Sequence, residues 1–232
     1  MVIDHERGTT IMDKWIYGFD KKRSTYNHLH IRNYDQRDFS KLIEIQQKAF
    51  PPPFPSELWW TKEQLENQIK TFRDGCLCIE VDGEVAGSMT TMITSLDDEN
   101  IDHKWEAITA NGTMKTHDPN GNTLYVIDLC VNPEYRSIGL GKQLTQAMYE
   151  TVVHLDLERL VGGARMPKYY LYEDELTPEE YVNLVLKADI EDPVVTFLLK
   201  SGRSPIKPVK DYLEDAESCN YGLLTEWRNP FY

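Results

Sequence analysis

The sequence predicts an α+β fold in which helices flank a mixed, mostly antiparallel central sheet. Two apolar segments, residues 76–81 and 84–92, are joined by Asp82-Gly83, a two-residue turn that accepts positive φ and links antiparallel strands. A third apolar segment, residues 124–131, runs through a glycine-containing turn into a helical pattern. Hairpins together with strands that pass directly into helices are typical of this fold class.

Residues 1–27 are predicted to form an N-terminal extension, and residues 28–232 a single domain. No internal repeat or low-complexity linker divides this longer part of the chain. Within the extension, residues 15–19 are a candidate short strand. The domain opens with a predicted strand at residues 29–32.

Two helices are expected after this first strand. Asp35 is expected to cap the first helix, which ends before Pro51-Pro52-Pro53 because proline cannot continue a helix. Thr61 and Gln64 have the spacing of a capping box, in which each side chain accepts a hydrogen bond from the backbone N–H of the other residue. They predict the start of the second helix, whose apolar face carries Leu65, Ile69 and Phe72.

The polar stretch of residues 94–122 is too long to be an idle connector in a compact domain. It is therefore a candidate substrate-side loop. His117, within it, is open to two interpretations. It is either a catalytic histidine or a residue of the turn that it forms with Asp118 and Pro119.

The C-terminal part is predicted to complete the sheet with three strands, at residues 160–164, 205–213 and 219–227. In the first of them, Gly162-Gly163 permits close approach of a ligand or of another backbone.

Two helices are predicted between these strands. Thr177 and Glu180 form a second capping box, with Pro178 at the first helical position, and predict a helix at residues 178–188. Asp192-Pro193 opens the penultimate helix, which ends at Gly202. The helix at residues 178–188 is therefore an insertion before the penultimate helix.

Composition limits the function classes. The net charge of −13 argues against nucleic acid as the main partner, because phosphate binding needs a basic surface. The acidity suits a cationic amine and equally serves solubility. No run is long and apolar enough for a membrane span, and the N-terminus lacks the apolar core of a secretion signal, so we expect no membrane contact and a cytoplasmic location. The four cysteines are expected to be buried free thiols, and no Cys/His ligand set predicts a metal.

The richest segment chemically is residues 124–149. Pro133 ends the strand, and Gly139 and Gly141 let the backbone approach a ligand closely with its N–H groups pointing outward. The helix that follows begins at these glycines, and the unpaired amides of its first turn favour an anion. Two cations accompany the turn, Arg136 and Lys142. The segment therefore predicts a cradle for a pyrophosphate.

Spacing excludes two other phosphate-binding motifs. A P-loop has four residues between its glycines and Ser or Thr after its lysine, whereas one residue separates Gly139 from Gly141 and Gln143 follows the lysine. A dinucleotide fingerprint has a third glycine where Leu144 stands. An ordinary strand-to-helix turn remains the alternative.

The segment resembles motif A of the GNAT family of acetyl-CoA-dependent N-acyltransferases. That motif reads Arg/Gln-x-x-Gly-x-Gly/Ala after a strand ending Val-x-Pro-x-Tyr, and this chain matches it from Val131 to Gly141. The resemblance covers about residues 29–227 and implies a GNAT fold with acetyl-CoA as the acyl donor. Residues 116–121, 128–131 and 162–167 are also similar to the acetyltransferase part of bacterial proteins in which this domain is fused to a carbon–nitrogen hydrolase.

The resemblance also implies where coenzyme A binds. In this family the strand before motif A splays from its neighbour and binds pantetheine through its backbone, which by position implies Leu129 and Val131. The pyrophosphate would be bound by Arg136, Ser137, Ile138, Gly139, Leu140, Gly141 and Lys142.

Asp128 is the candidate general base, because family members often carry a carboxylate on this strand. Strand alternation places Asp128 and Cys130 on the face opposite Leu129 and Val131, so a structural role for Asp128 is also open. Many members use a tyrosine to protonate the leaving thiolate, and Leu198 occupies its place here. Water could protonate the thiolate instead, or a tyrosine of the insertion could replace the missing one. The candidates are Tyr169, Tyr170 and Tyr172, for which the wall of an aromatic pocket is the favoured role.

The leading hypothesis is an N-acetyltransferase that moves an acetyl group from acetyl-CoA to a primary amine by direct attack in a ternary complex. The amine is a small molecule or a peptide, and a homodimer is left open. The alternative is a non-catalytic acyl-CoA-binding sensor or interaction module of GNAT fold. It is motivated by the missing helix tyrosine and by the two interpretations of Asp128.

Overall fold

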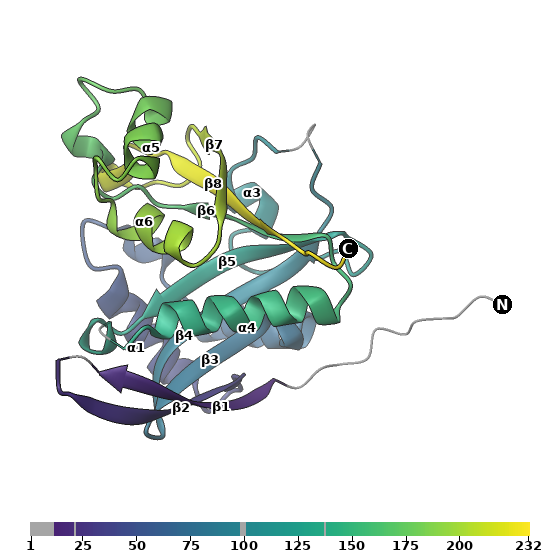
Figure 1. Ribbon diagram of the computed structural model, residues 1–232. Coiled ribbons are helices and arrows are strands. Elements are labelled where there is room, and N and C mark those ends of the chain that lie inside the picture. The colour runs from purple at the N-terminus through teal and green to yellow at the C-terminus, as the bar shows by residue number, and fades with distance from the viewer. Residues whose placement is uncertain (1–11, 21, 98–100, 137) are drawn as a thin grey trace.

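An eight-stranded sheet forms the centre of the described part of the molecule, in the order β1-β2-β3-β4-β5-β6-β8-β7 (Figure 1). The structure, a computed structural model, describes residues 12–20, 22–97, 101–136 and 138–232. Within these ranges β5 and β6 are parallel and all other neighbours are antiparallel, which confirms the predicted mixed sheet. The strands are β1 (Asp13–Asp20), β2 (Thr25–Asn33), β3 (Cys76–Val81), β4 (Glu84–Thr94), β5 (Thr123–Val131), β6 (Arg159–Ala164), β7 (Ser204–Val209) and β8 (Gly222–Arg228).

Residues 13–20, which belong to the predicted N-terminal extension, take part in the sheet as β1. β1 pairs with β2 along its whole length, which confirms the strand predicted at residues 15–19. The strand predicted at residues 29–32 begins earlier, at Thr25. The expected boundary at residue 28 falls inside β2, and the division into an extension and a domain stays a prediction.

One face of the sheet is covered by α1 (Phe39–Ala49), α2 (Lys62–Thr71) and the short α3 (Trp105–Thr109), which pack in one hydrophobic cluster. The capping box at Thr61 and Gln64 is confirmed. The predicted cap of α1 is wrong, because the helix begins after Asp38 and not after Asp35. The Asp38 N–H donates to the Asp35 carbonyl at 3.0 Å, so residues 35–38 form a turn of their own before the helix starts.

The opposite face carries α4 (Leu140–His154), which crosses in front of the sheet in Figure 1. α5 (Pro178–Leu186) and α6 (Pro193–Lys200) pack together in a third cluster beside β6 and β8. The second capping box is confirmed, and the Asp192 carboxylate accepts hydrogen bonds from the first N–H groups of α6. The helical insertion predicted before the penultimate helix is therefore present.

Two predicted segments differ from the structure. The candidate loop at residues 94–122 contains α3, whose Trp105 side chain is buried and donates from Nε1 to the Ile127 carbonyl at 3.0 Å. The strand predicted at residues 205–213 ends earlier, at Val209, and the strand predicted at residues 219–227 starts later, at Gly222, because the chain turns at Tyr212. The Tyr212 N–H donates to the Asn220 carbonyl, which closes this turn.

The sheet opens between β5 and β6. Their pairing spans Thr123 to Tyr125 on β5 and Arg159 to Val161 on β6. Beyond Tyr125, the edge of β5 that faces β6 has no partner strand among the described residues. β6 continues along β8 instead, from Arg159 to Ala164. This opening positions the candidate site.

Candidate active site

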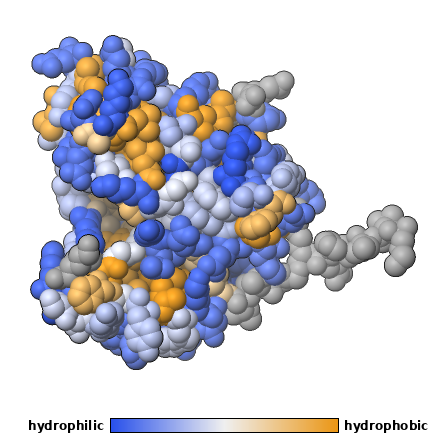
Figure 2. All heavy atoms as spheres, in the orientation of Figure 1, coloured by the Kyte–Doolittle hydropathy of each residue, from blue (hydrophilic) through white to orange (hydrophobic). Residues whose placement is uncertain are grey.

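A cavity of about 670 Å³ occupies the opening between β5 and β6. Its walls come from β5, the start of α4, the end of β6, the residues around α6, and the segment that joins α1 to α2. In Figure 2 the outline of the molecule is indented on the left, between the part that carries α5 and α6 and the part below it that carries β1 and β2. The cavity collects residues that are more than 150 positions apart, from Gln46 to Tyr221.

A β-bulge in β5 shapes the middle of the cavity. Thr90 of β4 pairs with Asp128 and Thr91 pairs with Val126, so Ile127 is an extra residue on β5. A bulge of this kind bends a strand and redirects side chains. Ile127 packs in the cluster of α1 and α2, and the Asp128 carboxylate reaches Trp60 Nε1 of the same cluster at 3.4 Å.

Asp128 combines access to the cavity with a poorly solvated carboxyl group. Its side chain is partly exposed and lines the cavity. Burial raises the pKa of Asp128 from 3.8 to about 6, against hydrogen bonds with Cys130 and Trp60 that lower it. A carboxyl group with this pKa is mostly ionised at neutral pH and can still accept a proton.

Leu129 and Val131 lie on the other face of β5, as strand alternation predicts. Both line the cavity and pack partly against the cluster of α4. Their strand offers an unpaired backbone edge toward β6, which a ligand with amide groups can use. Their predicted contact with pantetheine stays a prediction.

The start of α4 forms the outer end of the cavity. Gly139 adopts a left-handed backbone with φ +83°, and the first intrahelical acceptor is its own carbonyl, which bonds to the Gln143 N–H. The amides of Leu140, Gly141 and Lys142 precede that bond and lack an intrahelical acceptor. Arg136 and Lys142 are exposed at this end and line the cavity.

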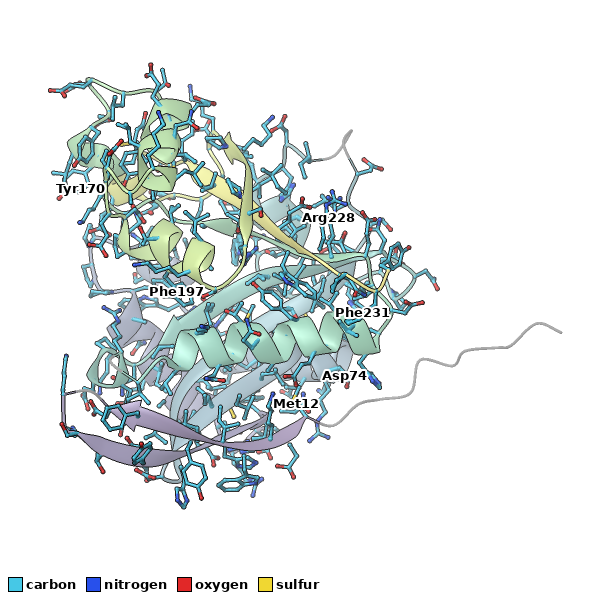
Figure 3. The ribbon with its side chains drawn as sticks, in the orientation of Figure 1. Met12, Asp74, Tyr170, Phe197, Arg228 and Phe231 are labelled. Atoms are coloured by element: carbon cyan, nitrogen blue, oxygen red, sulfur yellow. The ribbon has the colours of Figure 1, made fainter. Side chains whose placement is uncertain are left out.

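A glycine at position 141 is also favoured by the packing of α4 against α6. A Cβ atom built there would lie 3.1 Å from the Phe197 ring of α6, whereas one at Gly139 would meet nothing within 4 Å. Figure 3 labels Phe197 between α6 and α4. Gly141 therefore permits the contact between α4 and α6, and Gly139 permits the turn.

Ile138 and Ser137 are the two remaining residues of the predicted pyrophosphate cradle. Ile138 does not line the cavity, since its side chain packs against Gly18 of β1 and its N–H donates to the Tyr135 carbonyl at 3.3 Å. Ser137 lies outside the described residues. Their predicted roles in binding a pyrophosphate stay predictions.

No phenol from the insertion reaches the cavity. Leu198, at the position where many family members carry a tyrosine, is buried and lines the cavity. The Tyr169 hydroxyl donates to the Leu176 carbonyl, Tyr170 is exposed, and neither they nor Tyr172 line the cavity. Neither a proton donor nor an aromatic wall from this insertion is therefore found.

His117 has a structural environment. Its Nδ1 accepts a hydrogen bond from the Ile93 N–H at 3.1 Å, and its ring stacks on Phe72. Burial lowers the pKa of His117, and the residue does not line the cavity. The structure therefore favours the structural interpretation.

Several residues that line the cavity could not be assigned to it from the sequence. Trp60 and Trp105 lie near Asp128, and Tyr212 and Arg203 lie where β5 and β6 part. Arg165 makes ion pairs of 2.7 Å with Asp215 and Glu217, and its guanidinium lies 5.8 and 5.3 Å from the ring centroids of Phe50 and Phe54. These residues are dispersed along the chain, and no local spacing connects them.

Two negative findings apply to the described ranges. They contain no group of three or more His, Cys, Asp or Glu side chains arranged to hold a metal ion. None of their helices is long and apolar enough to cross a bilayer. The four cysteines are free, as expected. Cys76, Cys78 and Cys130 are buried, whereas Cys219, also expected to be buried, is partly exposed.

Comparison with known proteins gives the same assignment as the sequence resemblance. The model of the acetyltransferase (GNAT) family matches residues 39–169. The chain is 48% identical over 222 residues to a Bacillus subtilis (strain 168) protein named uncharacterized N-acetyltransferase YkwB, covering 96% of this chain and 97% of that protein. It is 34% identical over 203 residues to the probable hydrolase YhcX of the same organism, covering 87% of this chain and 39% of that protein.

A solved structure shows the same fold. The GNAT-like decarboxylase GphF in complex with isobutyryl-CoA superposes with a TM-score of 0.70 at 21% identity, covering 86% of this chain and 98% of that chain. The GNAT fold and the similarity to a hydrolase-fused acetyltransferase domain, both expected from the sequence, are confirmed. The chain is therefore an acetyltransferase that belongs to the GNAT family.

Proposed function

We propose that the protein transfers an acetyl group from acetyl-CoA to a primary amine by direct attack in a ternary complex. The observation that carries this proposal is the position of Asp128. A carboxyl group with a raised pKa lines the same cavity as the start of α4, whose first amides lack an intrahelical acceptor. The two features are what an acyl-CoA and a proton-losing amine need in one site.

The donor is held along β5 and α4 in this proposal. The amides of Leu140, Gly141 and Lys142, with the Arg136 and Lys142 side chains, would bind the pyrophosphate. The pantetheine arm would lie in the opening between β5 and β6 and bond to the free backbone edge of β5 at Leu129 and Val131. The fit rests on chemistry present in the chain, namely unpaired amides and exposed cations at one end and an unpaired strand edge inside.

The acceptor would enter from the side of α1 and α2. Phe50, Phe54, Trp60 and Trp105 line that part of the cavity, and Asp128 lies at its inner end. The Asp128 carboxylate would take the proton that the amine loses on attack, directly or through water. A neutral amine is the nucleophile, so a base beside the thioester shifts the bound ammonium toward the reactive form.

The alternative function, a non-catalytic acyl-CoA sensor, is motivated by Leu198, which replaces the tyrosine that protonates the leaving thiolate in many family members. The test incubates the protein with acetyl-CoA and a panel of small amines and of peptides with a free N-terminus. The release of free thiol is followed continuously. We expect at least one amine to raise CoA release above the hydrolysis background, with one equivalent of amide formed per CoA. Tight acetyl-CoA binding without amine-dependent release across the panel would refute the transferase proposal and favour the sensor.

A further inference from the structure

Arg203 lies at the closed end of the cavity. It follows α6 by three residues, is 5% exposed, and lines the cavity. Its Nη2 donates to the Gly162 carbonyl at 3.3 Å and to the Thr225 carbonyl at 2.7 Å. Gly162 is the first residue of β6 after Val161, where the pairing with β5 ends. The guanidinium therefore stands where the two strands come together.

This guanidinium has no counter-ion among the described residues. Its Nε is buried without a hydrogen-bond partner, and no carboxylate lies within 4.0 Å of it in the described ranges. The other well-buried arginines each have one: Arg32 pairs with Asp38, Arg159 with Glu226 and Arg165 with Asp215. A buried charge without a partner is costly, so its retention at a cavity wall points to an anion supplied by a ligand.

The phenols around Arg203 do not supply that anion. Tyr125, Tyr149 and Tyr212 are the titratable groups that interact with it. Burial raises the pKa of Tyr149 and of Tyr212 to about 12 and holds that of Tyr125 well above its ordinary value of 10, so all three are neutral at physiological pH. Burial also lowers the pKa of Arg203 to about 10, which leaves the guanidinium charged at neutral pH.

The proposed reaction creates one anion at this place. An acyl-CoA whose pyrophosphate lies at α4 extends its pantetheine arm inward between β5 and β6, so its thioester approaches the closed end of the opening. When the thioester is cleaved, the sulfur becomes a thiolate. Leu198 of α6, five residues before Arg203, provides no proton for it.

We propose that Arg203 is a further catalytic residue, which stabilises the leaving thiolate of CoA by its positive charge in place of a proton donor on α6. This inference rests on the proposed function. The amine nitrogen forms a bond to the carbonyl carbon, and the C–S bond breaks with its electron pair going to sulfur. The proton lost by the amine goes to the Asp128 carboxylate, and the CoA thiolate leaves beside the guanidinium.

The test measures the thiol pKa of CoA bound to the whole protein, from thiolate absorbance over a pH series. For the wild type we expect a value about 1 to 3 units below that of free CoA in the same buffer. Arg203→Gln keeps N–H donors for the two carbonyls but removes the charge, and should return the value toward that of free CoA. Arg203→Lys, which keeps a charge, should lie between them and serves if the glutamine variant does not fold.

Other charged groups at the cavity need a control, because they also act on a bound thiol. They are Asp128, Arg136, Lys142, Arg165, Asp215 and Glu217. Arg228→Gln removes an exposed arginine outside the cavity and should leave the bound thiol pKa unchanged. A bound thiol pKa in the wild type equal to or above that of free CoA would overturn the inference. So would a bound thiol pKa in Arg203→Gln that stays as low as in the wild type.

The same measurement separates this inference from the proposed function, because it needs no amine. Amine-dependent turnover with an unshifted thiol pKa would refute the role of Arg203 alone. A lowered thiol pKa without turnover on any amine would refute the proposed function instead.

Discussion

The Asp128 carboxyl group lies in a poorly solvated environment that disfavours its ionised form. It lies 3.4 Å from Trp60 Nε1 and has no cationic partner within ion-pair distance among the described residues. Strand alternation alone leaves a structural and a catalytic role equally open. The bulge at Ile127 and the raised pKa favour the catalytic one, because a structural carboxylate usually has donors that lower its pKa.

Asp128→Asn should separate these roles. If Asp128 is the base, the variant binds acetyl-CoA about as well and loses turnover by ~10² to 10⁴-fold. At neutral pH its melting temperature should equal or exceed that of the wild type, because an ionised group in a poorly solvated place is removed. Single-turnover rate and melting temperature are measured on one preparation. A lower melting temperature with a near-native rate would assign Asp128 a structural role.

The pH dependence follows from the same pKa. The folded protein keeps the Asp128 proton up to about pH 6, whereas an unfolded aspartate loses it near 3.8. Stability from this group is therefore fully present below the lower value and is lost as pH rises through the higher one. The rate should rise with pH through about 6, and this limb should be absent in Asp128→Asn.

At the scale of elements, we expect the turn before α4 to bind the pyrophosphate of the donor. Arg136→Ala should weaken CoA binding by removing a charge-assisted contact of about 1.5 to 3 kcal/mol, about 10-fold to 150-fold in affinity. Gly139→Ala should also weaken it, since a side chain at φ +83° strains the turn that directs the amides. Calorimetric titration with CoA measures both.

Gly83 is a matched control for Gly139. It has φ +90° and open space around an added Cβ, but lies in the turn between β3 and β4 and does not line the cavity. Gly83→Ala should lower stability by a similar amount and leave CoA affinity unchanged. Unchanged affinity in folded Arg136→Ala and Gly139→Ala would remove the pyrophosphate from the start of α4.

Elements with local signals were predictable from the sequence. The capping boxes at Thr61 and Thr177 and the Asp82-Gly83 turn depend on residues within four positions of one another, and all three are confirmed. The cap of α1 was predicted wrongly, because the turn formed by residues 35–38 and the Arg32–Asp38 ion pair decide where the helix begins. The bulge at Ile127 depends on the register with β4, which no local pattern records.

At the scale of the whole molecule, the site is assembled from segments that only the fold brings together. Motif A was visible because its residues are consecutive. The acceptor side was not, since Phe50 and Trp60 come from the segment between α1 and α2, and Arg165 and Glu217 from two further segments. Arg203 also lacks a sequence signal, because its unpaired charge is a property of what surrounds it.

The net charge of the chain is −13, whereas several positive side chains lie along the cavity. Arg136 and Lys142 at the outer end and Arg203 at the closed end place positive charge along the cavity. An anionic donor is thus attracted locally by a protein that is acidic overall. The sheet opening, the start of α4 and Asp128 together support direct transfer between two bound substrates.

Direct transfer makes one measurement decisive. The protein is mixed rapidly with excess acetyl-CoA, first without and then with an amine that it acetylates, and free CoA is followed through the first turnover. Direct transfer predicts no burst of CoA without amine, and with amine a release of CoA that equals the amide formed. A burst of CoA that approaches one equivalent per protein before amine is added would contradict it, because the acetyl group would then have moved to the protein first.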